Sequence, residues 1–283
     1  MNQEISRRIS FLGFVMTCGI VLYHCGPSPA VPSVGLDHAC FDAISNFFTN
    51  TATLAMSYFF AVTGYLLFLN LSLRGWACKV KRRTFSLLVP YLAWQCLTFA
   101  VNLLHHEAMT KREFLKTTFL LDQWPPDGAL WYLYAVFLLA LLAPVILLIY
   151  ERAGRCLGFC LTFAAILFFY WLQSADFVSA FCQYSYVNNI LRYMPSYLLG
   201  AYFGFYCAQA SEIDNLRFLL AALLAAFSAD AVFSGFFSLI TLQVLPLFAL
   251  FLLPMPESLC DRKVYHLSFL SLIHISEPTR QEA

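Results

Sequence analysis

The sequence predicts an all-α fold, a polytopic bundle of about eight transmembrane helices followed by an incomplete ninth. Of its 283 residues, 60% are hydrophobic and only 12% are charged, and the mean hydropathy is +0.70. The apolar residues form long blocks separated by short polar stretches, which is the layout of a helical membrane protein. A soluble domain of this length would be far more polar.

The first apolar run, FLGFVMTCGIVLY at 11–23, ends on His24. Arg7 and Arg8 precede it, but no small-residue cleavage site follows, and further spans do. These features predict an uncleaved anchor whose N-terminus lies in the cytoplasm. An ionisable side chain near the end of a span is costly to keep, which makes His24 a candidate functional residue.

Two spans are expected at 51–71 and 85–104, on either side of the densest basic stretch of the chain. That stretch, RGWACKVKRR at 74–83, is expected to form a cytoplasmic loop. The segment 25–50 has no Lys or Arg and is expected outside, as is the polar segment 105–128.

The remaining apolar blocks predict the later spans. They lie at 129–150, 156–173 and 191–208, with two short spans within 218–253 and the incomplete ninth at 264–273. The charged stretch ERAGR at 151–155 is expected inside. Asp230 falls between the two short spans, where its simplest role is in a turn.

The distribution of positive charge sets the orientation. Of the 17 Lys and Arg residues, twelve lie inside in this topology, namely Arg7, Arg8, Arg74, Lys79, Lys81, Arg82, Arg83, Arg152, Arg155, Arg217, Arg262 and Lys263. Four lie outside, namely Lys111, Arg112, Lys116 and Arg192, and the seventeenth, Arg280, lies in the tail. This bias predicts a multi-pass protein of the inner (plasma) membrane with both ends of the bundle in the cytoplasm.

The ten cysteines form no CxxC pair and no cluster with histidine, so no metal site is expected. Cys25 and Cys40 fall in one predicted outer loop and could form a disulfide if their geometry allows it. A net charge of +1 without a large basic face gives no reason to expect a nucleic-acid partner. Residues 1–270 are interpreted as one membrane domain, and 271–283 as a non-native tail that resembles translated sequencing-adapter sequence.

Five stretches together resemble acyltransferase family 3, a family of integral-membrane O-acyltransferases. They are FLGFVMTCGIVLYH, YFFAVTGYLLF at 58–68, KRRTFSLLVPYLAW at 81–94, ALWYLYAVFLLALLAP at 129–144 and PSYLLGAYFG at 195–204. The resemblance runs from about Ile9 to Gly204, and the family's last helices have no counterpart, which implies a C-terminal truncation. It implies transfer of an acyl group, usually acetyl from cytoplasmic acetyl-CoA, to a hydroxyl of a surface or exported glycan. A glycan or lipid-linked sugar would then be the acceptor, and the lipid bilayer the other partner.

The resemblance makes His24 the candidate catalytic base or acyl relay, because imidazole titrates near neutral pH and can accept a proton from a hydroxyl. The alternative is a side chain that only hydrogen-bonds a neighbour or interfacial water. Many family members carry an arginine eleven residues before this histidine, where this chain has Gly13. Arg7 or Arg8 could substitute for it.

Arg82 and Arg83 match the family's basic block and are the candidate acetyl-CoA contacts, because guanidinium groups pair with phosphate oxygens. The alternative is that these positive charges only set the orientation of the protein in the membrane. This is the interpretation that we prefer for Lys79 and Lys81.

Three further positions have structural interpretations. Gly64, next to Thr63, is expected to let helices pack closely. Trp131 and Tyr132 are expected to anchor a span at the membrane interface in preference to stacking on a sugar.

Two other functions stay open. A secondary transporter of a small solute or lipid-linked sugar would show inverted repeats with broken helices, and the sequence has no convincing internal repeat. A membrane scaffold would need neither His24 nor the basic stretch. The oligomeric state and the identity of the acyl group and acceptor are not determined by these patterns.

Overall fold

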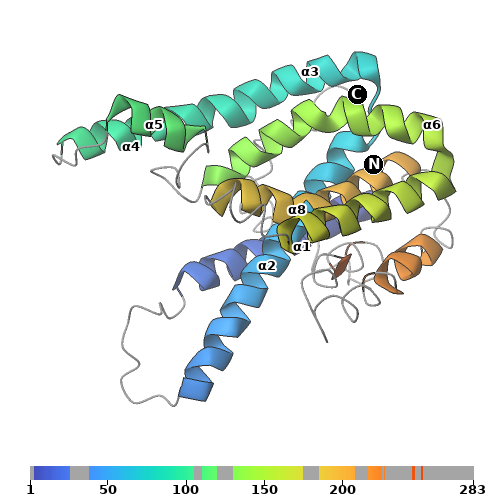
Figure 1. Ribbon diagram of the computed structural model, residues 1–283, viewed down its shortest axis with the longest axis horizontal. Coiled ribbons are helices and arrows are strands. Elements are labelled where there is room, and N and C mark those ends of the chain that lie inside the picture. Colours follow the sequence, from blue (N-terminus) through green and yellow to red (C-terminus); the bar gives the residue numbers. More distant parts are fainter. Residues whose placement is uncertain are drawn as a thin grey trace.

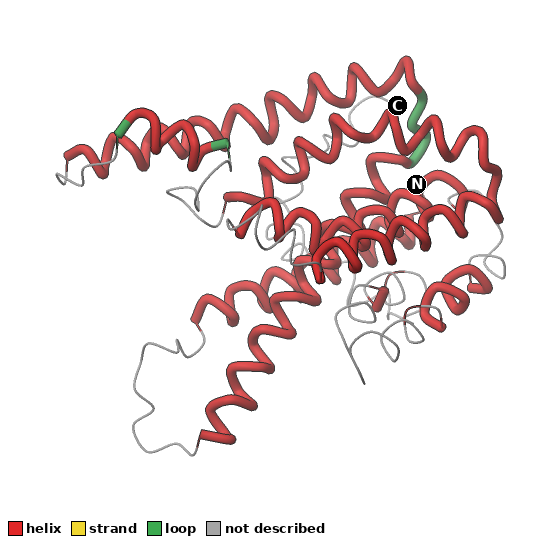
Figure 2. Tube along the Cα trace, in the orientation of Figure 1, coloured by secondary structure: helices red, strands yellow, loops and turns green. Residues whose placement is uncertain are grey.

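The computed structural model describes residues 3–25, 38–104, 110–119, 130–174, 185–207, 216–224, 226, 244–245 and 250. Over these residues the chain is helical without β-strands, as Figures 1 and 2 show. Four described stretches are long and apolar enough to cross a membrane: Ile5–His24, Asp42–Phe68, Leu73–Leu104 and Trp131–Phe169. The predicted all-helical membrane class is therefore confirmed, while the total of eight spans stays a prediction.

The first two helices, α1 (Gln3–Cys25) and α2 (His38–Phe68), pack side by side (Figure 1). The Tyr58 hydroxyl donates a hydrogen bond to the Ile9 carbonyl at 2.7 Å. At Gly19, an added Cβ would lie only 2.9 Å from the Thr51 methyl group, so a glycine lets the two helices approach closely here.

The start of α2 at His38, and not at 51, corrects the predicted boundary. The predicted topology placed Thr49 in the outer segment 25–50 and Thr51 and Thr53 at the start of the span 51–71. Their hydroxyls donate to the carbonyl four residues earlier, at 2.9, 2.8 and 3.0 Å. Because these polar groups are satisfied within the helix, α2 continues through a stretch that a hydropathy boundary excludes.

The basic stretch 74–83 is part of a helix, α3 (Leu73–Arg83), where a loop was expected. The Ser72 side chain caps its N-terminus. Lys79 Nζ donates to the carbonyls of Leu67 (2.9 Å) and Leu69 (3.0 Å), the last residues of the preceding helix and its turn. A cation at a helix C-terminus is favourable, so Lys79 stabilises the end of α2 in addition to any topogenic role.

The chain continues from α3 through a π-helical turn, η1 (Thr84–Leu88), into α4 (Val89–Leu104). In this turn the Val89 N–H bonds to the Thr84 carbonyl five residues earlier. Pro90 follows directly and would remove one bond from a regular helix and crowd the carbonyl four residues before it. The wider turn accommodates Pro90 without ending the helix.

The long helix α6 (Trp131–Ser174) bends at Gly154, whose φ of 69° and ψ of 175° are not helical. A straight helix of 44 residues would be about 66 Å long, more than twice the thickness of a hydrocarbon core. Figure 1 shows α6 turning back on itself. The bend lies within the charged stretch 151–155 that separates two predicted spans.

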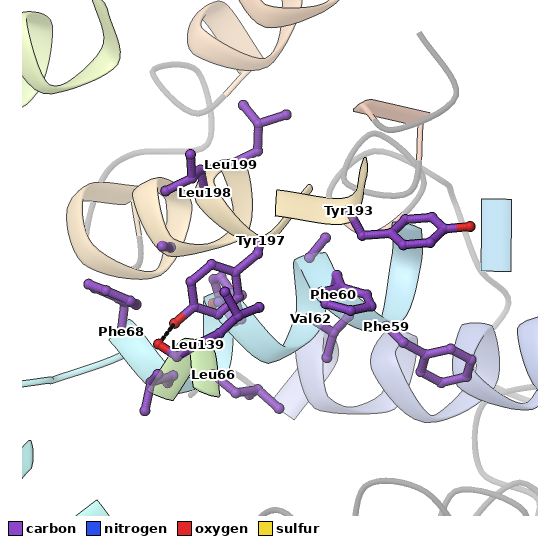
Figure 3. Packing of buried hydrophobic residues seen from close by; sticks show 14 of the residues in the cluster. Phe59, Phe60, Val62, Leu66, Phe68, Leu139, Tyr193, Tyr197, Leu198 and Leu199 are labelled. Carbon is purple, nitrogen blue, oxygen red and sulfur yellow. Dashed lines mark hydrogen bonds between the residues drawn. The ribbon is translucent and has the colours of Figure 1, made fainter. Parts of the chain in front are cut away.

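The most extensive helix contact joins α2 to α8 (Ser185–Tyr202), which continues into a second π-helical turn, η3 (Phe203–Cys207). Three glycines make this contact possible: an added Cβ at Gly64, Gly200 or Gly204 would overlap the backbone of Tyr197, Ala61 or Tyr65, respectively. The expected packing role of Gly64 is confirmed. Figure 3 shows the aromatic and aliphatic side chains that fill the space around this contact.

Several predictions fall outside the described residues. They concern Asp230, the incomplete span at 264–273, the tail from 271 and the side chains of Cys25 and Cys40.

Candidate functional site

His24 lies in the last turn of α1 and is exposed. Its ring meets the ring of Tyr23 edge to face, with the centroids 5.3 Å apart. The contact between Ile9 and Tyr58 marks the opposite end of α1, so the histidine lies at the far end of the first span from Arg7 and Arg8. An imidazole in this position is open to a substrate from the side on which α1 ends.

Gly13 is buried, and no arginine occupies the position that the family resemblance expects. Arg8 donates from Nη1 to the Leu250 carbonyl at 3.3 Å. Sixteen residues of helix, about 24 Å, separate Arg8 from His24, so neither nearby arginine reaches the histidine in this conformation.

The structure separates the two candidate phosphate-binding arginines. Arg82 is exposed, whereas Arg83 is only 3% exposed and lies in the interior of the bundle. Arg83 lies in the neighbourhood of the phenol groups of Tyr132 and Tyr197. Because successive residues of a helix point about 100° apart, adjacent arginines can meet different surroundings.

The interior near Arg83 contains hydrogen-bonded hydroxyls. Tyr132 donates to the Phe59 carbonyl at 3.1 Å, and its oxygen lies 2.8 Å from Thr63 Oγ1. Since the Tyr132 proton is directed to Phe59, Thr63 is the donor in their pair. The Tyr197 hydroxyl donates to the Leu139 carbonyl at 3.1 Å, the bond drawn in Figure 3.

A second polar group lies nearer the His24 end of the bundle. The Thr53 side chain lies close to the Tyr193 hydroxyl, and Tyr23, the neighbour of His24, lies near the same group. The Arg192 guanidinium lies 5.9 Å from the Tyr193 ring centroid. The first residues of α8 are therefore brought close to the last turn of α1.

Aromatic rings connect the two groups. Tyr193 stacks on Phe60 with 5.3 Å between centroids, and Phe60 meets Tyr132 edge to face at 5.1 Å. We call Tyr193, Phe60 and Tyr132 the aromatic line. Its rings come from α8, α2 and α6 and lie between the neighbourhood of His24 and that of Arg83. These two predicted site residues therefore do not touch each other.

Trp131 and Tyr132 occupy a different environment from the one expected. Both are 8% exposed, and Trp131 packs against Phe60 and Tyr193 within the bundle. Neither ring is positioned as an exposed anchor or as an open platform for a sugar. The apolar sequence around them is compatible with an interfacial belt and also with a buried helix start. Because α8 packs against this region through Tyr193, the helix start is buried.

Sequence reasoning did not select Tyr193, Tyr197 or Thr53. Tyr197 lies in PSYLLGAYFG, which was noted only as a family block, and Tyr193 lies two residues before it. The available signal was the recurrence of tyrosine in apolar helices, because a buried tyrosine hydroxyl needs a partner. Its partners are far away in the sequence, so the sequence pattern could not identify them.

Within the part of the chain that the structure describes, no group of three or more His, Cys, Asp or Glu side chains could hold a metal ion.

The apolar helices and the interior polar groups define the protein as an integral-membrane helix bundle with an exposed histidine at the end of its first span. Its sequence matches acyltransferase family 3, described as an acyltransferase domain, over residues 10–273. The chain therefore belongs to this family and is a membrane acyltransferase. No curated protein and no solved structure shows significant similarity to it.

Proposed function

We propose that this protein is an O-acyltransferase that moves an acyl group, expected to be acetyl, from cytoplasmic acyl-CoA to a hydroxyl of a surface or exported glycan. The observation that carries the proposal is the family match over 10–273, which includes every residue assigned a role below. The exposed position of His24 at the end of α1 supports it.

In the proposed reaction, the acceptor hydroxyl oxygen attacks the thioester carbonyl carbon of acyl-CoA. His24 takes the hydroxyl proton as the new C–O bond forms. The C–S bond then breaks, and the CoA thiolate leaves and receives the proton back from the imidazolium. The products are an O-acyl ester and free CoA, so the reaction needs no oxidant or metal ion to balance.

The two arginines have different proposed roles because only one of them is exposed. Arg82 is accessible to the hydrated phosphates of CoA, and a guanidinium can bind them through two parallel hydrogen bonds. Arg83 carries its charge into the bundle, near Tyr132 and Tyr197. The aromatic rings between Arg83 and His24 keep Arg83 away from the acyl group, so its proposed role is to position the helices around the site through its surroundings at Tyr132 and Tyr197.

The test replaces His24 in the protein expressed in cells that lack the native gene. His24→Ala should lower glycan acetylation by about 10² to 10⁴, the usual contribution of a positioned base. It should leave membrane insertion intact, because one hydrogen bond at an exposed site contributes about 1 kcal/mol to stability. Val21→Ala, a neighbouring exposed position on α1, is the matched control and should retain acetylation.

Acetylation would be followed by mass spectrometry of envelope glycans, beside an immunoblot of the membrane fraction. Wild-type acetylation in His24→Ala at equal protein level would contradict the catalytic role. Loss of the membrane-inserted protein together with activity would indicate a structural role. If the wild-type protein accumulates a solute and never transfers an acyl group, it is a transporter and the proposed function is wrong.

A further inference from the structure

The helix α5 (Lys111–Thr118) is held against α4 at several points. Phe114 stacks on Phe99 with ring centroids 4.4 Å apart, and the Tyr91 hydroxyl donates to the Thr118 carbonyl. At the other end, the Glu113 carboxylate accepts hydrogen bonds from the N–H and hydroxyl of Thr110, at 2.8 and 2.9 Å. This capping box stabilises the helix N-terminus.

These contacts show how α5 lies along α4. Thr118 meets Tyr91 near the start of α4, and Phe114 meets Phe99 farther along it, so the two helices are antiparallel. The N-terminus of α5 is therefore near the last turn of α4, where the candidate span Leu73–Leu104 ends. In Figure 1, α4 and α5 extend together away from the other described helices.

The exposed surface of α5 combines positive charge with apolar side chains. Lys111 and Arg112 are exposed, and Leu115 and Phe119 are 54% and 38% exposed. Residues four apart lie on one face of a helix, which places Lys111, Leu115 and Phe119 in line. The single acidic residue of α5, Glu113, is hydrogen-bonded to Thr110 as part of the cap.

The neighbouring surface of α4 is apolar and exposed. Trp94, Leu97 and Val101 are 53%, 52% and 42% exposed, although they belong to a stretch apolar enough to cross a membrane. Such a surface suits the lipid hydrocarbon, so the end of α4 marks the level of the lipid headgroups. Basic side chains at that level can extend to the phosphates while apolar neighbours stay in the hydrocarbon.

We propose that α5 binds anionic phospholipid headgroups through Lys111 and Arg112 in its first turn, which lies at the level of the headgroups. It also carries Lys116, so it holds three of the four basic residues that the predicted topology places outside. Positive charge is depleted on that side of a membrane protein, and its concentration on one helix fits a binding function. Each basic residue near an anionic membrane surface contributes about 1 kcal/mol, or about fivefold in affinity. The two exposed residues together should enrich an anionic lipid about 25-fold beside α5.

The test places a fluorophore on Leu115→Cys, in a variant whose native cysteines are replaced, and reconstitutes the whole chain in phosphatidylcholine vesicles with a minority of phosphatidylglycerol. Either lipid is supplied in brominated form as a contact quencher. Brominated phosphatidylglycerol should quench far more strongly per molecule than brominated phosphatidylcholine. The preference should fall at 1 M salt, where the screening length shrinks to about 3 Å.

The variant pair Lys111→Gln with Arg112→Gln should abolish the preference, and Lys111→Arg with Arg112→Lys should preserve it. Thr110 and Glu113 stay in place in both, so the helix cap is unchanged. Equal quenching by the two lipids, or no quenching by either, in the labelled protein that keeps Lys111 and Arg112 would overturn the proposal. It would also be overturned if the glutamine variant kept the preference. None of these results depends on acyltransferase activity, so the proposed function is tested separately.

Discussion

Replacing Gly200 by alanine should destabilise the contact between α2 and α8. The hydroxyl groups around Tyr132 and those around Tyr193 both depend on this contact. An added Cβ would lie 2.7 Å from the carbonyl carbon and 2.9 Å from the Cα of Ala61, and even closer to its carbonyl oxygen. Ordinary contact begins at 3.4 Å, so the carbonyl carbon alone requires the helices to separate by the difference of 0.7 Å, and the closer oxygen requires more. Backbone atoms cannot rotate aside as a flexible side chain can.

The magnitude follows from two opposing effects. Overpacking in an interior costs about 1–3 kcal/mol, and the rigid backbone of Ala61 favours the upper end. The better helix propensity of alanine offsets about 1 kcal/mol. We expect Gly200→Ala to lower the free energy of unfolding by about 2 kcal/mol.

Gly75→Ala is the matched control, because an added Cβ there would meet only the Ser72 hydroxyl, at 3.2 Å, in the first turn of α3. It should be neutral or slightly stabilising. Both variants would be unfolded with denaturant in detergent micelles and followed by far-UV circular dichroism. If Gly200→Ala is as stable as Gly75→Ala, the close packing of α2 on α8 is refuted.

Two further predictions concern orientation and the arginine pair. Lys81 is exposed and does not take part in capping α2. In a protein without other exposed cysteines, a reporter cysteine at Lys81 should be shielded from a membrane-impermeant thiol reagent in intact cells. One at Lys111 should label, and the reverse pattern would invert the topology. Arg82→Gln should raise the KM for acyl-CoA about tenfold with little change in kcat, since it loses a charge-assisted contact to phosphate. Arg83→Gln should lower kcat without a comparable change in KM, and steady-state kinetics giving the opposite assignment would contradict the proposed roles.

Sequence patterns were sufficient for properties that depend on local composition. Long apolar runs predicted the membrane class, and the charged stretch at 151–155 predicted the break in α6 where Gly154 bends the helix. The position of His24 at the end of the first span also follows from counting residues. These properties are local because each span must be long enough and apolar enough by itself.

Local patterns misplaced the boundaries where polar groups find partners within helices. The threonines of α2 bond to their own helix, and the basic stretch of α3 caps the end of α2 through Lys79. The predicted topology placed the residues before 51 and the stretch 74–83 in loops because a sequence pattern does not register these bonds.

The functional arrangement depends on tertiary contacts. By itself, the sequence determined that this is a helical membrane protein of acyltransferase family 3 with a histidine at the end of its first span. Only the tertiary structure decided that Arg82 is exposed while Arg83 is buried, and that Tyr193 and Tyr132 both pack against Phe60. The physical reason is that each of these outcomes depends on which helix face meets a neighbour. That choice is made by contacts such as Gly200 against Ala61, between residues far apart in the chain.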